Sequence, residues 1–321
     1  AGGMNYKHFQ YDMVKKGKRQ IGSTFKPFVY AAAIDQLHLS PCDTFPDSQF
    51  CIEKDKFGNP EKWCPRNSGD KYGRTRTLKN ALANSINTVT ARLMDKIGPR
   101  PVIKLAKNLG IEQKILPVPS IALGTPDLSV YEMVAAYSAF ANKGVYTKPI
   151  LIERIEDKNG TILFEYKRET RDVLSEEAAY VTVNLLEGVT QAGSGIRLRT
   201  TGATNNAYKS VVTGYPYEFD NPIAGKTGTT QNQSDGWFMG ITPNLVTGVW
   251  AGCEDRSVHF RDIQFGQGAN MALPIFAEYM QRVYADTANS KVFPEKFNIS
   301  RAIDLQLECD ETNSLIQEEE F

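Results

Sequence analysis

Residues 19–28 read Arg-Gln-Ile-Gly-Ser-Thr-Phe-Lys-Pro-Phe, and an alanine-rich apolar run follows them to about residue 39. This run predicts a mostly buried helix with Ser23 at or beside its N-terminus. Pro27 fits there, because a proline in the first turn gives up no intrahelical hydrogen bond. Residues three apart share a helix face, so Lys26 points the same way as Ser23. The stretch therefore places a hydroxyl and an amine together at the start of a core helix.

These two side chains can act as a nucleophile and its base. A serine hydroxyl reacts when a base within hydrogen-bond reach takes its proton. Lys26 can be that base if burial or a nearby cation lowers its pKa. The alternative is that Ser23 only caps the helix and Lys26 is solvated. The spacing alone is common, since Ser68 and Lys71 share it within a segment typical of a loop.

Two further motifs follow along the chain. Ser85-Ile86-Asn87 lies in a stretch of helical apolar spacing, where its polar side chains either line a cleft or form a polar kink between core helices. Lys226-Thr227-Gly228-Thr229 lies in a predicted strand whose glycines indicate close approach of another backbone. Its amine and hydroxyls could bind a carboxylate. A nucleotide phosphate loop is excluded, because Asp220 stands where that motif requires glycine.

The three motifs, in this order, resemble the motif set of the penicillin-recognising serine acyltransferases. Longer strings resemble the transpeptidase domain of class A (bifunctional) high-molecular-weight penicillin-binding proteins: residues 19–28, 123–125, 136–144, 225–230 and 235–240. The resemblance extends from the first residues to about Tyr284. It implies an α/β (α+β) fold of the penicillin-recognising serine transpeptidase or β-lactamase-like type, with a mainly antiparallel sheet flanked by helices and a mostly helical subdomain.

The resemblance also implies a role for each motif residue. Ser23 would attack the penultimate D-Ala carbonyl of a peptidoglycan stem peptide ending in D-Ala-D-Ala, with Lys26 as general base. Ser85, with Lys226 behind it, would pass a proton to the leaving amine. Asn87 would hold the substrate backbone and help to position Lys26. An amine of a neighbouring stem peptide would then take the acyl group, making a cross-link.

The substrate's terminal carboxylate would bind Thr227 and Thr229, on either side of Gly228. The backbone N–H groups of Ser23 and Thr229 would form the oxyanion hole. β-Lactam antibiotics would acylate Ser23 and leave slowly. Such a site needs no metal and no cofactor.

Three other functions are alternatives to transpeptidation. One is a hydrolase, either a β-lactamase or a D,D-carboxypeptidase. A β-lactamase would need a second base to activate water, for which Glu112 and Glu132 are the nearest candidates between the second and third motifs. A β-lactam sensor would be acylated without turnover. A scaffold that no longer reacts is disfavoured, because all five catalytic side chains are present.

Composition limits the remaining function classes. The 321 residues carry no net charge and no basic patch interleaved with aromatic residues, which disfavours nucleic acid as a partner. No apolar stretch approaches the ~20 residues of a membrane span. Relative to the family, two strands, a membrane anchor and an N-terminal glycosyltransferase domain are expected upstream, which makes this chain a fragment. The resemblance places the parent protein at the outer face of the bacterial cytoplasmic membrane.

The chain divides into a transpeptidase domain at residues 1–292 and an acidic tail at 293–321, predicted to be peripheral or poorly ordered. Residues 150–155 and 161–166 predict a β-hairpin, residues 175–189 a helix capped by Ser175, and residues 222–252 a sheet. Residues 199–221 form an insertion expected to be a loop beside the cleft.

The five cysteines leave several pairings open. Cys51 and Cys64 flank a polar hairpin, and an oxidising compartment would permit a bridge between them, with Cys42 as a competing partner. Cys253, at the end of an apolar strand, is expected to be a buried thiol. The histidines have no metal-ligand spacing.

Overall fold

The computed structural model describes residues 7–8, 10–199, 217–300 and 302–309. Its centre is an antiparallel sheet of three strands within these residues: β9 (Ala224–Thr229), β10 (Asp235–Thr242) and β11 (Leu245–Gly252), in the order β11-β10-β9. Trp237 of β10 lies opposite Gly228 of β9 and Trp250 of β11. Strand β9 is thus an edge of the described sheet.

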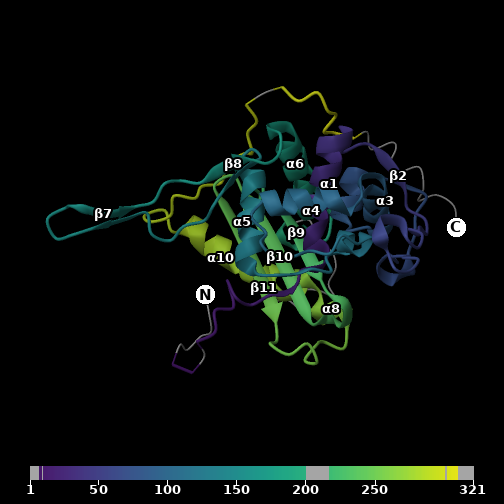
Figure 1. The fold of residues 1–321 in the computed structure, drawn as a ribbon, viewed down its shortest axis with the longest axis horizontal. Helices are drawn as coiled ribbons and strands as arrows, with labels where there is room; N and C mark the ends of the chain where they lie inside the picture. The colour runs from purple at the N-terminus through teal and green to yellow at the C-terminus, as the bar shows by residue number, and fades with distance from the viewer. Residues whose placement is uncertain (1–6, 9, 200–216, 301, 310–321) are drawn as a thin grey trace.

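Helices cover both faces of this sheet (Figure 1). Successive residues of a strand point to opposite faces, so Trp237 joins the larger core and Phe238 the smaller one. The larger core is built from helices α1 (Lys26–Leu37), α5 (Val130–Ala141) and α6 (Glu176–Ala192). The smaller one packs under α10 (Leu273–Ala285). Cover on both faces explains why every residue of β10 is buried.

A mostly helical part lies beside α1 and contributes α2 (Leu78–Ala83), α3 (Asn87–Ile97) and α4 (Pro99–Asn108). The remaining elements are short and pair over long sequence separations. The pairs are β1 (Arg19–Gln20) with β4 (Asp127–Leu128), β2 (Thr44–Pro46) with β3 (Thr75–Thr77), and β5 (Val145–Thr147) with β8 (Thr170–Asp172). Two short helices, α8 (Ile263–Gly266) and α9 (Gly268–Met271), lie between β11 and α10 in the sequence.

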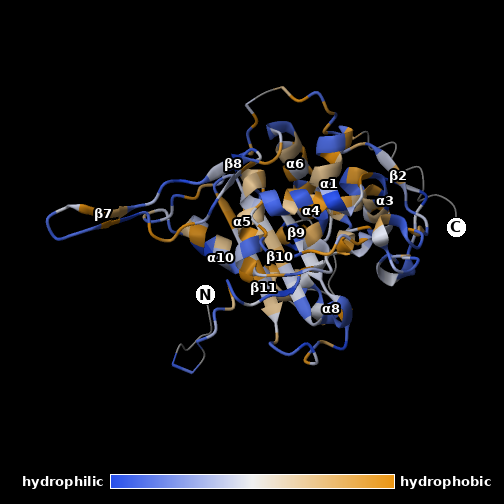
Figure 2. Cartoon of the chain, in the orientation of Figure 1, coloured by the Kyte–Doolittle hydropathy of each residue, from blue (hydrophilic) through white to orange (hydrophobic). Residues whose placement is uncertain are grey.

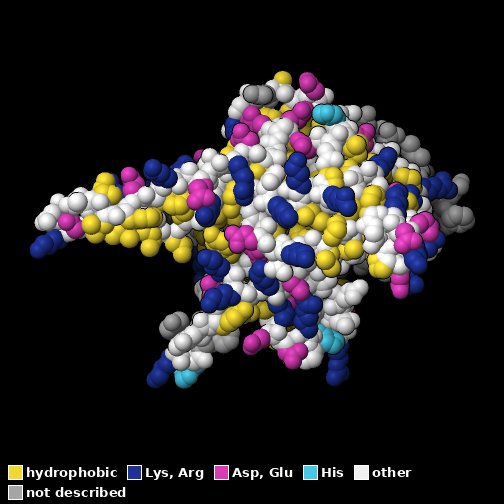
Figure 3. All heavy atoms as spheres, in the orientation of Figure 1, with side chains coloured by type: hydrophobic (Ala, Val, Ile, Leu, Met, Phe, Trp, Pro, Cys, Tyr) yellow, Lys and Arg dark blue, Asp and Glu magenta, His cyan; other side chains and the backbone are white. Residues whose placement is uncertain are grey.

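The predicted hairpin is present as β6 (Arg154–Glu156) and β7 (Ile162–Glu165), and it projects from the body (Figure 1). Its apolar side chains are exposed, among them Leu151, Leu163 and Phe164. Figure 2 shows the apolar residues near its outer end, and Figure 3 shows them along one side of the projection. The predicted helix at 175–189 is α6, and Ser175 caps it by accepting from Ala178 N. Most of the predicted loop at 199–221 lies outside the described residues.

The segment after residue 292 lies on the surface of the body and is anchored there. Its apolar side chains Ile303, Leu305 and Leu307 pack against the larger core, and Cys309 forms a disulfide with Cys42. Residues 302–309 are alternately exposed and half-buried. The three residues alternate with polar ones, which is the pattern of an extended chain lying on an apolar surface. The domain boundary at residue 292 stays a prediction.

The other cysteines give one confirmation and one correction. Cys51 and Cys64 form the expected disulfide. Cys253 is exposed, not buried, because β11 ends one residue before it. The α/β arrangement of an antiparallel sheet flanked by helices, with a helical part beside it, confirms the predicted fold class.

Candidate active site

Ser23 lies in a 3₁₀ turn, Gly22–Phe25, that leads directly into α1. This turn packs against β9 so closely that a Cβ on Gly228 would lie 2.8 Å from the carbonyl oxygen of Ile21. Gly22 adopts a positive φ of 53° and donates its N–H to the Gly124 carbonyl at 3.0 Å. Small residues therefore let β9, the turn and the segment that contains Gly124 meet beside Ser23. Ser23 lines a cleft of about 550 Å³ together with residues of all three segments.

Lys26 is fully buried and makes three hydrogen bonds through its amine. Its Nζ donates to the Ser85 carbonyl at 2.6 Å, to Ser85 Oγ at 3.2 Å and to Asn87 Oδ1 at 2.6 Å. The first motif therefore holds the second through Lys26. The alternative of a solvated Lys26 is excluded.

Ser85 stands between α2 and α3 with a positive φ of 57°. This left-handed conformation is unfavourable for a residue with a side chain, by about 1–2 kcal/mol. Its Oγ and its carbonyl oxygen are both within hydrogen-bond distance of Lys26 Nζ. Unfavourable backbone conformations of this kind gather at functional sites. The polar kink between two helices is therefore present, and Asn87 at its end lines the cleft as well.

Lys226 reaches the same serine from the strand. Its Nζ donates to Ser85 Oγ at 3.0 Å and to the Thr227 carbonyl at 3.0 Å. Thr227 Oγ1 lies 2.6 Å from Ser194 Oγ, and Thr229 Oγ1 accepts from Gly268 N at 3.0 Å. Sequence reasoning did not identify Ser194. Its position between two glycines, just after the end of α6, was the available signal.

Both lysines lie in surroundings that favour the neutral amine. Burial lowers the pKa of Lys26 well below its ordinary value, and the positive charge of Lys226 lowers it further. Burial lowers the pKa of Lys226 from 10.5 to about 7. Their two amines share one hydroxyl, that of Ser85. The arrangement can take a proton from one group and deliver it to another.

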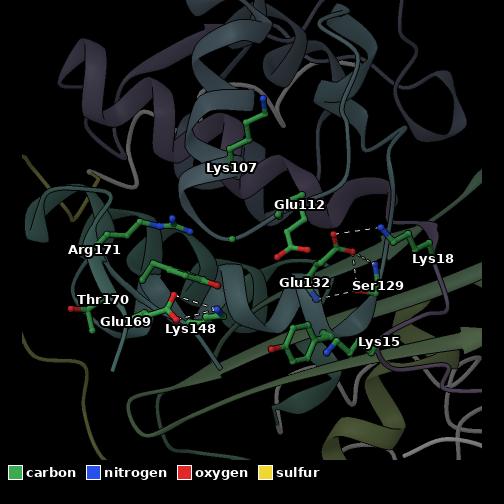
Figure 4. A pocket seen from close by; sticks show the side chains of 14 residues that line it. Lys15, Lys18, Lys107, Glu112, Ser129, Glu132, Lys148, Glu169, Thr170 and Arg171 are labelled. Atoms are coloured by element: carbon green, nitrogen blue, oxygen red, sulfur yellow. Dashed lines mark hydrogen bonds and ion pairs between the residues drawn. The ribbon is translucent and has the colours of Figure 1, made fainter. Parts of the chain in front are cut away.

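The two carboxylates considered as hydrolytic bases lie elsewhere. Glu112 and Glu132 line a separate cavity of about 600 Å³ (Figure 4). Glu132 accepts from both the N–H and the hydroxyl of Ser129, which makes it part of the capping box of α5. Neither carboxylate lines the cleft of Ser23. The chance match at Ser68 differs from Ser23 in that its lysine partner, Lys71, is exposed.

The cleft and its motifs agree with a comparison of the whole sequence. The family model of the penicillin binding protein transpeptidase domain matches residues 8–252. The chain belongs to this family. The resemblance of its motifs is thereby confirmed, and membership of the family implies acyltransferase activity.

Curated relatives of this transpeptidase domain are penicillin-binding proteins. Penicillin-binding protein 1A of Aquifex aeolicus is 34% identical over 286 residues, which are 88% of this chain and 36% of the relative. Penicillin-binding protein 2D of Bacillus subtilis is 31% identical over 282 residues, which are 88% of this chain and 38% of the relative. The chain thus spans little more than a third of the length of these relatives.

Solved structures share the fold of this penicillin-binding protein domain. The crystal structure of penicillin-binding protein 1A from Haemophilus influenzae superposes with a TM-score of 0.76 at 24% identity, over 93% of this chain and 46% of the other. PonA1 of Mycobacterium tuberculosis, solved in complex with penicillin V, gives a TM-score of 0.67 at 22% identity, over 90% of this chain and 75% of the other.

Among the described residues, no helix has both the length and the apolar character to cross a membrane.

Proposed function

We propose that this penicillin-binding protein domain is a peptidoglycan D,D-transpeptidase that works through an acyl-enzyme on Ser23. The observation that carries the proposal is the convergence of Lys26 and Lys226 on Ser85 Oγ, with Asn87 bonded to the amine of Lys26. Two buried lysines joined by one hydroxyl have little structural use, because burying an amine costs stability. They suit a site that has to move protons.

Acylation begins when Ser23 Oγ attacks the penultimate D-Ala carbonyl carbon of a stem peptide. Lys26 Nζ, kept neutral by burial, takes the hydroxyl proton. The backbone N–H groups of Ser23 and Thr229 stabilise the oxyanion of the tetrahedral intermediate. Thr227 and Thr229 hold the terminal carboxylate, and the lack of a side chain on Gly228 lets the strand lie against the turn of Ser23.

The intermediate collapses when Ser85 passes a proton to the leaving nitrogen. The C–N bond breaks and D-Ala leaves, while the proton that Lys26 took from Ser23 restores Ser85 through their hydrogen bond, with Lys226 on the other side of the Ser85 hydroxyl. The amine of a neighbouring stem peptide then attacks the ester, its proton passes through Ser85 and Lys26 back to Ser23 Oγ, and the cross-link forms as Ser23 is released. The strained ring of a β-lactam would acylate Ser23 in the same way and deacylate slowly.

The biological setting follows from the family. Stem peptides are extracytoplasmic, so the domain would act at the outer face of the cytoplasmic membrane. The intact protein would carry a membrane anchor and an N-terminal glycosyltransferase domain that makes nascent glycan.

Labelling with a fluorescent penicillin tests the proposal. The change Ser23→Ala removes the nucleophile, and we expect it to abolish covalent labelling. Ser68→Ala is the matched control, because Ser68 has the same spacing to a lysine and also lines the cleft. Labelling that survives Ser23→Ala and is lost with Ser68→Ala would refute the assignment.

A further inference from the structure

Helix α3, which begins with Asn87, has its N-terminal cap supplied from a distant segment. Ile86 precedes the helix and offers no side-chain oxygen to the first turn. The oxygen comes from Asn67, whose Oδ1 accepts from Asn87 N at 3.0 Å and from Thr88 N at 3.1 Å. Free N–H groups at a helix start need such acceptors. One carboxamide twenty residues away therefore fixes the first turn that bears Asn87.

Asn67 is itself held by a buried carboxylate. Its Nδ2 donates to Asp47 Oδ1 at 2.6 Å, and both residues are buried. The same Asp47 oxygen accepts from Thr88 Oγ1 at 2.7 Å, and the other accepts from Arg76 Nε at 3.0 Å. Asp47 and Asn67 thus clamp the first turn of α3 from two directions. Because every one of these groups is paired, the turn has little freedom to rotate.

The neighbouring backbone sets the orientation of the Asn87 side chain. Asn87 Nδ2 donates to the Arg66 carbonyl at 2.6 Å, so its Oδ1 is the end that faces Lys26. A carboxamide has one accepting end and one donating end. If it rotated, Lys26 would lose an acceptor and would face a donor instead. Residues 66 and 67 therefore fix both the position and the direction of this amide.

The segment bearing Arg66 and Asn67 is anchored just upstream. Ile52 and Trp63 exchange two backbone hydrogen bonds of 2.9 Å, and the next residues along, Cys51 and Cys64, form a disulfide. Arg66 lies only two residues beyond this closed loop. The loop therefore restrains the segment at its start, while Asp47 holds it at Asn67.

We propose that Asn67 is a positioning residue for acyl transfer, which sets the Asn87 carboxamide, and through it Lys26, by means of its hydrogen bond to Asp47. This inference rests on the proposed function of Ser23 and its neighbours. It assigns a catalytic consequence to a residue outside the three motifs. A displacement of about 1 Å in such a site can reduce the rate about a hundredfold.

The test uses the rate of acylation by a fluorescent penicillin, measured per active site, together with the fraction of protein that labels. Asn67→Ala removes the cap and the link to Asp47, and we expect acylation to slow by about 10- to 100-fold. A purely structural role would instead lower the labelled fraction and leave the rate constant of the labelled molecules unchanged. Ser175→Ala is the matched control, because it removes the side-chain cap of α6 outside the cleft. It should leave the rate constant unchanged.

A swap of the two side chains separates positioning from general damage. Asn67→Asp keeps an oxygen that can accept from the N–H groups of α3, but it places a second carboxylate next to that of Asp47. Because the two negative charges repel, this variant should also slow acylation. Adding Asp47→Asn restores the hydrogen bond with donor and acceptor exchanged, and should recover most of the rate. This comparison also serves if Asn67→Ala does not fold.

Each outcome decides the inference. Acylation of Asn67→Ala at nearly the wild-type rate, or a double variant no faster than Asn67→Asp, would overturn it. The wild-type protein is mapped in the same experiment. If it forms no adduct at Ser23, the proposed function fails and the inference fails with it; if it forms one while the variants are unaffected, the inference alone fails.

Discussion

Replacing Lys226 with methionine should stabilise the protein while impairing its chemistry. Lys226 is fully buried, and its burial lowers the pKa from 10.5 to about 7. Methionine has a similar length, carries no charge and tolerates an apolar site. The variant therefore removes the penalty of a buried amine and leaves Ser85 without one of its two lysine neighbours.

The magnitude follows from the two pKa values. In the unfolded chain the Lys226 amine has a pKa of about 10.4. Between pH 7 and 10.4 this amine is therefore protonated in the unfolded chain and mostly neutral in the folded protein. At about 1.4 kcal/mol per unit, the penalty is about 4–5 kcal/mol below pH 7, declines as the pH rises through this window, and vanishes above it. Losing the hydrogen bonds to Ser85 and Thr227, at about 1 kcal/mol each, offsets part of the gain. A net stabilisation of about 2–3 kcal/mol at pH 7 is expected.

Urea unfolding at pH 7 and at pH 9.5 measures this effect. We expect Lys226→Met to raise the free energy of unfolding at pH 7 and to lose that advantage at pH 9.5, where the remaining penalty of about 1 kcal/mol no longer exceeds the loss of two hydrogen bonds. Penicillin labelling of the same samples should be strongly slowed. Lys158→Met, on the exposed hairpin turn, is the control and should change stability by less than about 0.5 kcal/mol. A variant that is less stable at pH 7, or an advantage that grows with pH, would show that the buried amine of Lys226 does not destabilise the folded protein.

Three further changes test other parts of the account. Gly228→Ala should destabilise the domain by about 1–3 kcal/mol in thermal unfolding and slow labelling, because the added methyl group would lie 2.8 Å from a carbonyl oxygen of the adjoining turn; unchanged labelling would argue against close packing there. Replacing Cys42 and Cys309 by serine should cost about 2–5 kcal/mol in urea unfolding while the labelling rate is kept. Replacing Cys51 and Cys64 by serine should slow acylation by about tenfold, because the segment that orients Asn87 loses its anchor; an unchanged rate would show that the remaining contacts suffice.

The sequence predicted which residues meet at the site better than it predicted what holds them there. Spacing alone predicts that Ser23 and Lys26 share one side of a helix start, because helical periodicity is a local property. It could not show that Ser85 adopts a left-handed backbone conformation, since that depends on how α2 and α3 meet. The family resemblance, rather than the residue pattern, joined the three motifs into one site.

What sequence reasoning missed depends on contacts between distant segments. Asp47 and Asn67 are ordinary polar residues in loop-like sequence, and only the fold shows that both are buried against α3. The disulfide from Cys42 to Cys309 joins residues 267 positions apart, and no local pattern marks such a pair. The alternating apolar residues before Cys309 were the one available signal that this segment packs on the core.

The most direct measurement is the mass of the intact protein after incubation with a penicillin, followed by peptide mapping. We expect a stable adduct of one equivalent on the peptide that contains Ser23. Consumption of the antibiotic without an adduct would contradict this expectation in favour of a hydrolase. A protein that neither gains mass nor consumes the antibiotic would show that Ser23 is not reactive, although two lysines converge on Ser85.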